Sequence, residues 1–145
     1  MSLRELYQEM ILDHSKYPRN FGVLTHANHE HVGHNPLCGD KITIYLHEEN
    51  GVIKAVQFEG SGCAISLASA SLMTESIKGK TIAEFEALFS AFHVLVTEGK
   101  ETIDLGKLDS LRGVSAFPVR VKCATLAWHT LKAALLQDRN PATTE

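Results

Sequence analysis

The stretch that decides the fold is residues 41–58, KITIYLHEENGVIKAVQF. Its first part alternates apolar with more polar residues, which is the pattern of a half-buried strand, and its apolar members are Ile42, Ile44 and Leu46. The dipeptide Asn50-Gly51 follows, and it adopts the positive φ angles of a tight turn at low cost. The return strand, residues 52–58, then places one set of side chains on a common face, namely Val52, Lys54, Val56 and Phe58. The stretch therefore predicts a β-hairpin.

Helical periodicity surrounds this hairpin. Ser2 with Glu5, and Thr81 with Glu84, match the capping box that begins a helix, and Pro118 suits the first turn of another. The predicted helices span residues 2–14, 64–77, 81–96 and 118–136, with a turn or short helix within 97–117, a short strand near 29–33 and an irregular arm from residue 17 to 22. The fold class predicted is α+β, with a small antiparallel sheet of three strands packed against several helices.

Length and charge limit the classes of protein. A chain of 145 residues fits one domain, expected over 1–145 with residues 1–2 and 138–145 frayed, and buries about two-thirds of its unfolded surface without help from a metal. The net charge is −3 and the basic residues are scattered, so we expect no nucleic-acid partner. No apolar run is long enough to span a membrane, and the first residues lack a signal-peptide pattern, so we expect a cytoplasmic protein.

Three cysteines carry the main functional signal: Cys38, Cys63 and Cys123. An odd number cannot close into disulfides alone, and a reducing compartment favours free thiols or metal thiolates. Together with Asp40 they make four ligands, the number that a tetrahedral zinc site requires. His34 is the one histidine close enough in sequence to Cys38 to be an alternative ligand.

Each cysteine comes from a different predicted element. In an extended stretch, Cys38 and Asp40 would point to the same side, with Gly39 letting the backbone bend closely around a metal. Cys63 opens a helix, where the positive end of the helix dipole would favour its thiolate form. Cys123 lies about one turn into the last helix. The alternative for each is a small buried hydrophobic residue, an interpretation that suits Cys123 best.

Histidines offer a second metal hypothesis, because His26, His29, His31 and His34 lie within nine residues. Their spacings of three, two and three fit no single face of a strand or helix, so we favour an exposed polar strand. The remaining histidines are interpreted as surface or capping residues: His14, His47, His93 and His129. A cysteine hydrolase is not supported by any local signature, and the chain has no phosphate-binding glycine loop.

Several motifs resemble those of one family. They are residues 6–14 (LYQEMILDH), 17–20 (YPRN), 35–40 (NPLCGD), 60–66 (GSGCAIS) and 120–126 (RVKCATL). In this order, across about residues 3 to 137, they resemble the U-type iron–sulfur assembly proteins, the IscU/NifU N-terminal superfamily. Two features resemble its SufU branch: Lys122 replaces the histidine that precedes the third cysteine in the scaffold branch, and the connection over 97–117 is longer.

The resemblance implies a zinc ion held by Cys38, Asp40, Cys63 and Cys123. It also implies that Cys38 accepts sulfur as a persulfide from a pyridoxal-phosphate cysteine desulfurase of SufS type. We therefore expect a zinc-dependent sulfurtransferase that passes sulfur to downstream iron–sulfur assembly proteins, as a monomer or weak homo-oligomer. Two alternatives stay open: a scaffold on which a [2Fe–2S] cluster is assembled, and a structural zinc module that only binds a partner.

The resemblance further places Arg120 at a position expected to contact the desulfurase. Arg120 precedes Cys123 by about one helical turn, so it would lie beside the site. A solvated arginine on the helix face, without a partner, is the alternative.

Overall fold

A computed structural model describes residues 2–136 and 142–143. The elements in chain order are α1 (Leu3–Lys16), β1 (His29–Asn35), β2 (Asp40–Glu49), β3 (Val52–Ser61), α2 (Ala64–Ile77), α3 (Ile82–Glu98), the 3₁₀ helix η1 (Gly106–Ala116), α4 (Pro118–Leu135) and β4 (Ala142–Thr143). The predicted helices, the hairpin and the short helix within 97–117 are confirmed, with shifts of a few residues at their ends.

The sheet has the strand order β3-β2-β1-β4. Strands β1, β2 and β3 are antiparallel neighbours, which confirms the predicted three-stranded antiparallel sheet. The two-residue strand β4 adds to the outer edge of β1 in parallel. It comes from the tail that the sequence predicts to be frayed, and the rest of that tail lies outside the described residues.

A β-bulge changes the return strand of the hairpin. The predicted inward set of β2 is confirmed, since Ile42, Ile44 and Leu46 are fully buried. The pairing shifts between His47 and Glu48, so two residues of one strand oppose one of the other and the alternation changes there. As a result the buried residues of β3 are Ile53, Val56 and Phe58, while Lys54 is exposed, and the prediction of one continuous face from Val52 to Phe58 is wrong at its start.

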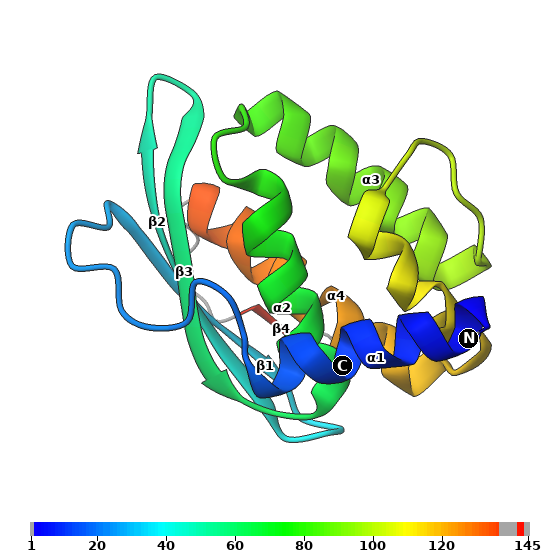
Figure 1. The fold of residues 1–145 in the computed structure, drawn as a ribbon. Coiled ribbons are helices and arrows are strands. Elements are labelled where there is room, and N and C mark those ends of the chain that lie inside the picture. The colour runs from blue at the N-terminus through cyan, green and yellow to red at the C-terminus, as the bar shows by residue number, and fades with distance from the viewer. Residues whose placement is uncertain (1, 137–141, 144–145) are drawn as a thin grey trace.

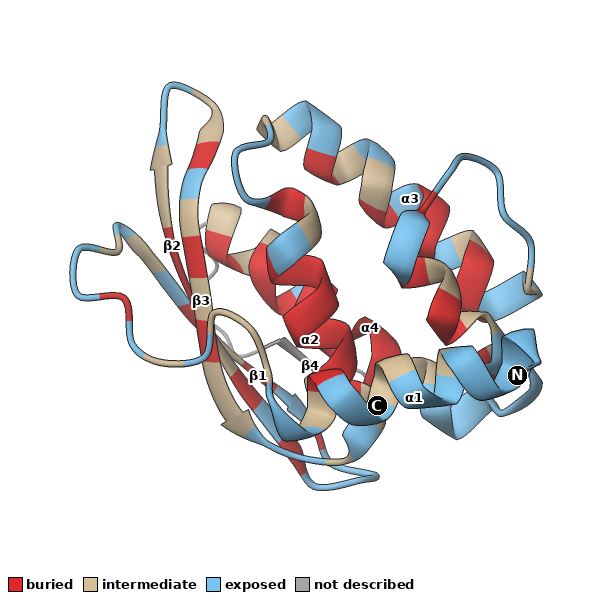
Figure 2. Ribbon diagram, viewed as in Figure 1, coloured by how far each residue is buried: buried red, intermediate tan, exposed pale blue. Residues whose placement is uncertain are grey.

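The helices cover one face of the sheet (Figure 1). Helices α2 and α4 lie directly on the strands, α1 packs on α2, and α3 and η1 close the far side of α2 and α4. Buried residues gather where these layers meet (Figure 2). Helix α4 approaches β1 closely at Gly33, where an added Cβ would lie 1.9 Å from the Thr130 hydroxyl, so the sheet and the helix that carries Cys123 are held tightly together.

Helix α2 is buried and rich in small hydroxyl side chains. Ser71 accepts hydrogen bonds from the arm that follows α1, through the Arg19 N–H at 2.9 Å. On the opposite side, Ser69 donates to the carbonyl of Ala124 in α4 and accepts from Trp128 Nε1 at 3.2 Å. The predicted close packing of this helix is therefore confirmed, and its buried polar groups are paired.

The arm after α1 pairs with the outer edge of β3. The Phe58 N–H donates to the carbonyl of Asn20 at 3.0 Å, and the Gly22 N–H donates to the carbonyl of Phe58 at 2.8 Å. The Phe21 ring meets the Phe58 ring edge-on. In the part of the chain that the structure describes, no helix is long and apolar enough to cross a bilayer.

His14 is fully buried, so its interpretation as a surface or capping residue is wrong. Its Nδ1 lies 2.7 Å from the Ser71 hydroxyl, and its Nε2 lies 3.7 Å from Glu75. The helical pattern of α1 did not reveal this burial, because it depends on the contacts of His14 with Ser71 and Glu75 of α2. Burial, followed by repulsion from Arg19, lowers the pKa of His14.

We expect stability to fall as the pH drops below about 6.5, because His14 binds a proton more readily in the unfolded chain. The loss continues down to the folded-state pKa, at no more than about 1.4 kcal/mol per pH unit. Denaturant unfolding at several pH values should show a flatter profile in His14→Gln. His26→Gln, which changes an exposed histidine, is the matched control and should keep the wild-type slope; an unchanged slope in His14→Gln would contradict the assignment.

Candidate metal centre

Cys38 lies in the tight turn that joins β1 to β2. The turn is closed by the Cys38 N–H, which donates to the carbonyl of Asn35 at 3.3 Å, and Gly39 takes a φ of 71°, a conformation that suits glycine. The predicted extended stretch is therefore wrong, and Cys38 and Asp40 are brought together by a hairpin instead. Cys38 is exposed in this turn, so its sulfur can meet another molecule.

Asp40 begins β2 and is 2% exposed. One carboxylate oxygen accepts the N–H of Cys63 at 2.9 Å, and the other accepts the side-chain amide of Asn35 at 3.3 Å. An added Cβ on Gly62 would lie 2.5 Å from Asp40 Oδ1, so the glycine leaves the space that this carboxylate occupies. A buried carboxylate held by two N–H donors is well placed to act as a fixed ligand.

Cys63 is the N-cap of α2, as its predicted place at the opening of a helix requires. Its sulfur accepts the N–H of Ser66 at 3.4 Å. This contact satisfies one of the N–H groups that the first turn of a helix leaves without a partner. Cys63 is half-buried.

Cys123 lies in the second turn of α4 and is 2% exposed. Its sulfur is 3.2 Å from that of Cys38 and 3.4 Å from the Asn35 amide nitrogen. Burial raises the pKa of the Cys123 thiol, and hydrogen bonds with Cys38 and Asp40 raise it further. A thiolate at this position therefore needs a nearby cation, which a bound metal ion supplies.

The structure brings ligand atoms of Cys38, Asp40 and Cys123 within 4.8 Å of one another. No other such group occurs among residues 2–136 and 142–143. The Cys63 sulfur lies outside this group, although the backbone N–H of Cys63 donates a hydrogen bond to Asp40. The donor set consists of the Cys38 and Cys123 thiols, the Asp40 carboxylate and, next to them, the Cys63 thiol, and it suits zinc. The Asn35 amide and the Cys63 N–H donate hydrogen bonds to members of this set, as metal ligands require of their surroundings.

The histidine hypothesis does not gain support. His34 is exposed on β1, between the buried Gly33 and Asn35, and does not join the metal-ligating group. The four neighbouring histidines do lie in or just before a strand, but the strand is not uniformly exposed, since His31 is 7% exposed and His29 Nδ1 contacts the carbonyl of Ala134 at 2.9 Å.

Asn35 and Gly62 are the site residues that the sequence analysis missed. The signal was present, because Asn35 opens the motif Asn-Pro-Leu-Cys-Gly-Asp and Gly62 immediately precedes Cys63. Their roles depend on which side chains the hairpin and α2 bring together, and that information is not local.

Arg120 lies on the exposed face of α4, with its guanidinium 4.5 Å from the centre of the Phe117 ring. Both residues line a groove of about 410 Å³ between α1, η1 and α4. The apolar part of this lining consists of Leu3, Ile11, Ile65, Val114 and Phe117. Because Phe117 and Ile65 are close in sequence to Cys123 and Cys63, the groove borders the cysteine-bearing end of the molecule.

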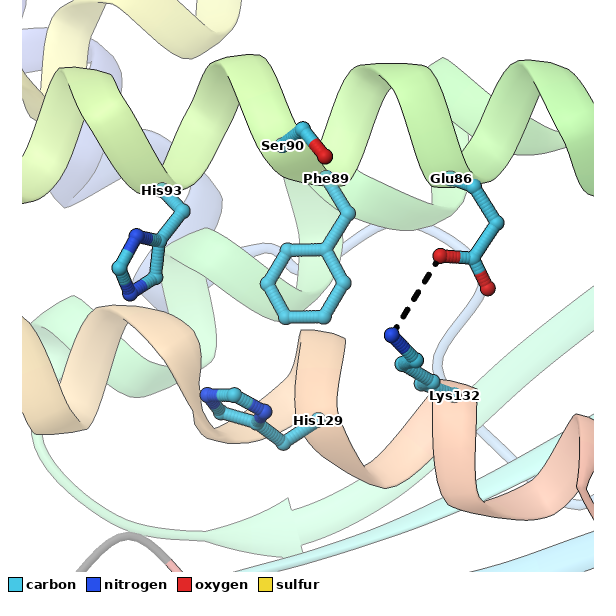
Figure 3. Close-up of a pocket in the computed structure, with 6 residues that line it drawn as sticks. All are labelled: Glu86, Phe89, Ser90, His93, His129 and Lys132. Atoms are coloured by element: carbon cyan, nitrogen blue, oxygen red, sulfur yellow. Dashed lines mark ion pairs between the residues drawn. The ribbon is translucent and has the colours of Figure 1, made fainter.

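A second groove lies between α3 and α4 (Figure 3). It is lined by Glu86, Phe89, Ser90, His93, His129 and Lys132. Lys132 pairs with Glu86 at 3.5 Å, and the His129 ring meets the Phe89 ring edge-on. None of the predicted site residues lines it, so this groove is separate from the cysteines.

The fold and the donor set together define a small α+β protein with a candidate metal centre built from cysteine and aspartate. The chain belongs to the family described as the NifU-like N-terminal domain, whose model matches residues 6–141. It is 42% identical over 140 residues to the zinc-dependent sulfurtransferase SufU of Bacillus subtilis, covering 94% of each chain.

Two further proteins place the chain within this family. It is 42% identical over 144 residues to the iron–sulfur cluster assembly scaffold protein IscU of Thermotoga maritima, covering 97% of this chain and all of that protein. A crystal structure from Fervidobacterium islandicum, described as an iron–sulfur cluster assembly scaffold protein for the SUF system, superposes with a TM-score of 0.83 at 38% identity. That alignment covers 92% of this chain and 99% of the other.

Proposed function

We propose that this protein is a zinc-dependent sulfurtransferase, which accepts persulfide sulfur from a pyridoxal-phosphate cysteine desulfurase and passes it on for iron–sulfur cluster assembly. One observation carries the proposal: within a group of otherwise buried ligands, Cys38 is exposed. The similarity to the Bacillus subtilis sulfurtransferase SufU supports it. So does Lys122, because the position before the third cysteine carries no imidazole for a cluster.

Cys38, Asp40, Cys63 and Cys123 would hold the zinc. The ion, when bound, would keep the thiols ionised near neutral pH. The Cys38 thiolate then attacks the outer sulfur of the desulfurase persulfide. A new S–S bond forms on Cys38, the S–S bond of the desulfurase breaks, and the desulfurase cysteine leaves as a thiolate that takes up a proton. No external oxidant or reductant is needed, because one S–S bond replaces another.

The groove beside Arg120 is proposed to be the surface of this protein on which the desulfurase docks. Its apolar lining and exposed guanidinium offer a surface that a protein partner could cover. Contact there would bring the partner's persulfide to the exposed Cys38 at the same end of the molecule. The alternative for Arg120 is the packing on Phe117 alone.

A [2Fe–2S] scaffold is the second candidate, favoured by the equal identity to the Thermotoga maritima scaffold protein. Anaerobic reconstitution with iron and sulfide separates the two. We expect the zinc-loaded protein to keep its zinc and to develop no stable cluster absorbance. One cluster per chain that displaces zinc and survives desalting would favour the scaffold and contradict sulfur transfer as the main activity.

A further inference from the structure

Asn35 is the last residue of β1 and is fully buried. Its amide nitrogen lies 3.3 Å from Asp40 Oδ2 and 3.4 Å from Cys123 Sγ. A carboxylate and a thiolate only accept hydrogen bonds, so the nitrogen rather than the oxygen of the amide must face them. The amide oxygen has no hydrogen-bond partner in the described structure. A buried amide oxygen without a hydrogen-bond partner lowers stability. Its presence indicates that the N–H groups of the Asn35 amide have a role.

The proposed ligands differ in the support that they receive. Asp40 accepts N–H groups from Asn35 and Cys63, Cys123 accepts from Asn35, and the Cys63 sulfur accepts from the Ser66 N–H. Cys38 is different. Among the described residues its sulfur has one polar contact, the Cys123 thiol, and that thiol can donate only while it is protonated. Metal ligands lose their protons, so on a bound metal Cys38 would have no donor.

We propose that Asn35 is a positioning residue that sorts the ligands, holding Asp40 and Cys123 on the metal and leaving Cys38 as the thiolate free to depart. An N–H donor draws charge from a thiolate, which makes it less nucleophilic and fixes its direction. Cys38 lacks such a donor and lies in an exposed turn, whereas Asp40 and Cys123 lie on a strand and a helix. The inference rests on the proposed function and adds the residue that holds two of the proposed ligands in place.

The test replaces Asn35 in the full-length, metal-loaded protein. Asn35→Ala removes the N–H donors, and Asn35→Leu removes them while keeping the branched shape and the number of heavy atoms. We expect zinc transfer to a chromogenic chelator to become about 10- to 100-fold faster in both variants, the usual effect of losing a partner of a metal ligand. In the cobalt-substituted variants, the sulfur-to-metal charge-transfer band should move to lower energy. With limiting iodoacetamide, labelling should spread from Cys38 to Cys123.

Asn28→Ala is the matched control. Asn28 immediately precedes β1, at the end opposite Asn35, and its side-chain amide also donates a hydrogen bond, to the carbonyl of Glu48. It should match the wild type in all three measurements. Wild-type zinc release and an unshifted cobalt spectrum in both Asn35 variants would overturn the proposal. Unfolding of both would overturn it as well, because Asn35 would then serve the fold. Failure of the proposed function would appear separately, as a wild-type protein that takes up no sulfur on Cys38.

Discussion

Cys38→Ala is expected to lose sulfur acceptance by at least about a thousand-fold, the scale of effect seen when a nucleophile is removed. The physical reason is the position of this residue: Cys38 is the exposed member of the candidate ligand group, whereas Cys123 is 2% exposed, so we expect a persulfide to reach Cys38. Mass spectrometry after incubation with the desulfurase and cysteine should show a gain of one sulfur atom in the wild type and none in the variant.

The same variant also tests the structural zinc module. Cys38 lies in a turn outside the hydrophobic core, so Cys38→Ala should keep the wild-type far-ultraviolet circular dichroism. Leu37→Ala is the matched control, since Leu37 is an exposed neighbour in the same turn and has no ligating atom. It should accept sulfur normally. Wild-type sulfur uptake on Cys63 or Cys123 in Cys38→Ala would show that Cys38 is not the acceptor, and an unfolded variant would support a structural metal.

The second large effect is expected at Trp128, which lies fully buried in α4. Its ring stacks on the Phe92 ring, with centroids 4.5 Å apart, and lies nearly parallel to the Phe85 ring. Both phenylalanines belong to α3. The Trp128 Nε1 donates to the Ser69 hydroxyl of α2. Trp128→Ala should therefore lower the free energy of unfolding by about 3–5 kcal/mol, because it leaves a cavity and removes a hydrogen bond.

Such a loss is a large fraction of the about 5–15 kcal/mol that stabilises a typical domain. It can be measured by urea denaturation of the zinc-loaded proteins at a fixed zinc concentration, since bound metal adds to stability. Trp128→Phe is the control and should lose much less, because it keeps an aromatic ring in the stack. A loss below about 1 kcal/mol in Trp128→Ala would mean that this cluster does not anchor α4.

Local sequence patterns were sufficient for most of the fold. The alternation at residues 42, 44 and 46 fixed the inward face of β2, and Thr81 with Glu84 forms both hydrogen bonds of the predicted capping box. The bulge after His47 was not predictable, because it depends on how the two strands pair over several residues. Strand β4 was missed for a related reason: two residues carry no periodicity.

The site was predicted less completely than the fold. Spacing and residue type identified Cys38, Asp40 and Cys123, and the structure brings these three together. The role of Asn35 and the burial of His14 depend on contacts between residues distant in the chain. Sequence patterns predict which face of a helix or strand is buried, whereas these features depend on which residues of other elements pack against that face.

The buried hydroxyls of α2 have a consequence for the metal centre that reaches beyond stability. Ser71 ties the helix to the N-terminal arm, and Ser69 ties it to α4. Because Ser69 bonds to both Ala124 and Trp128 of α4, α2 cannot slide along its axis relative to α4 without breaking these hydrogen bonds. Cys63 begins α2 and Cys123 lies on α4. The Ser69 hydroxyl therefore helps to fix the separation of two candidate ligands from a distance, while Cys38 lies on neither helix.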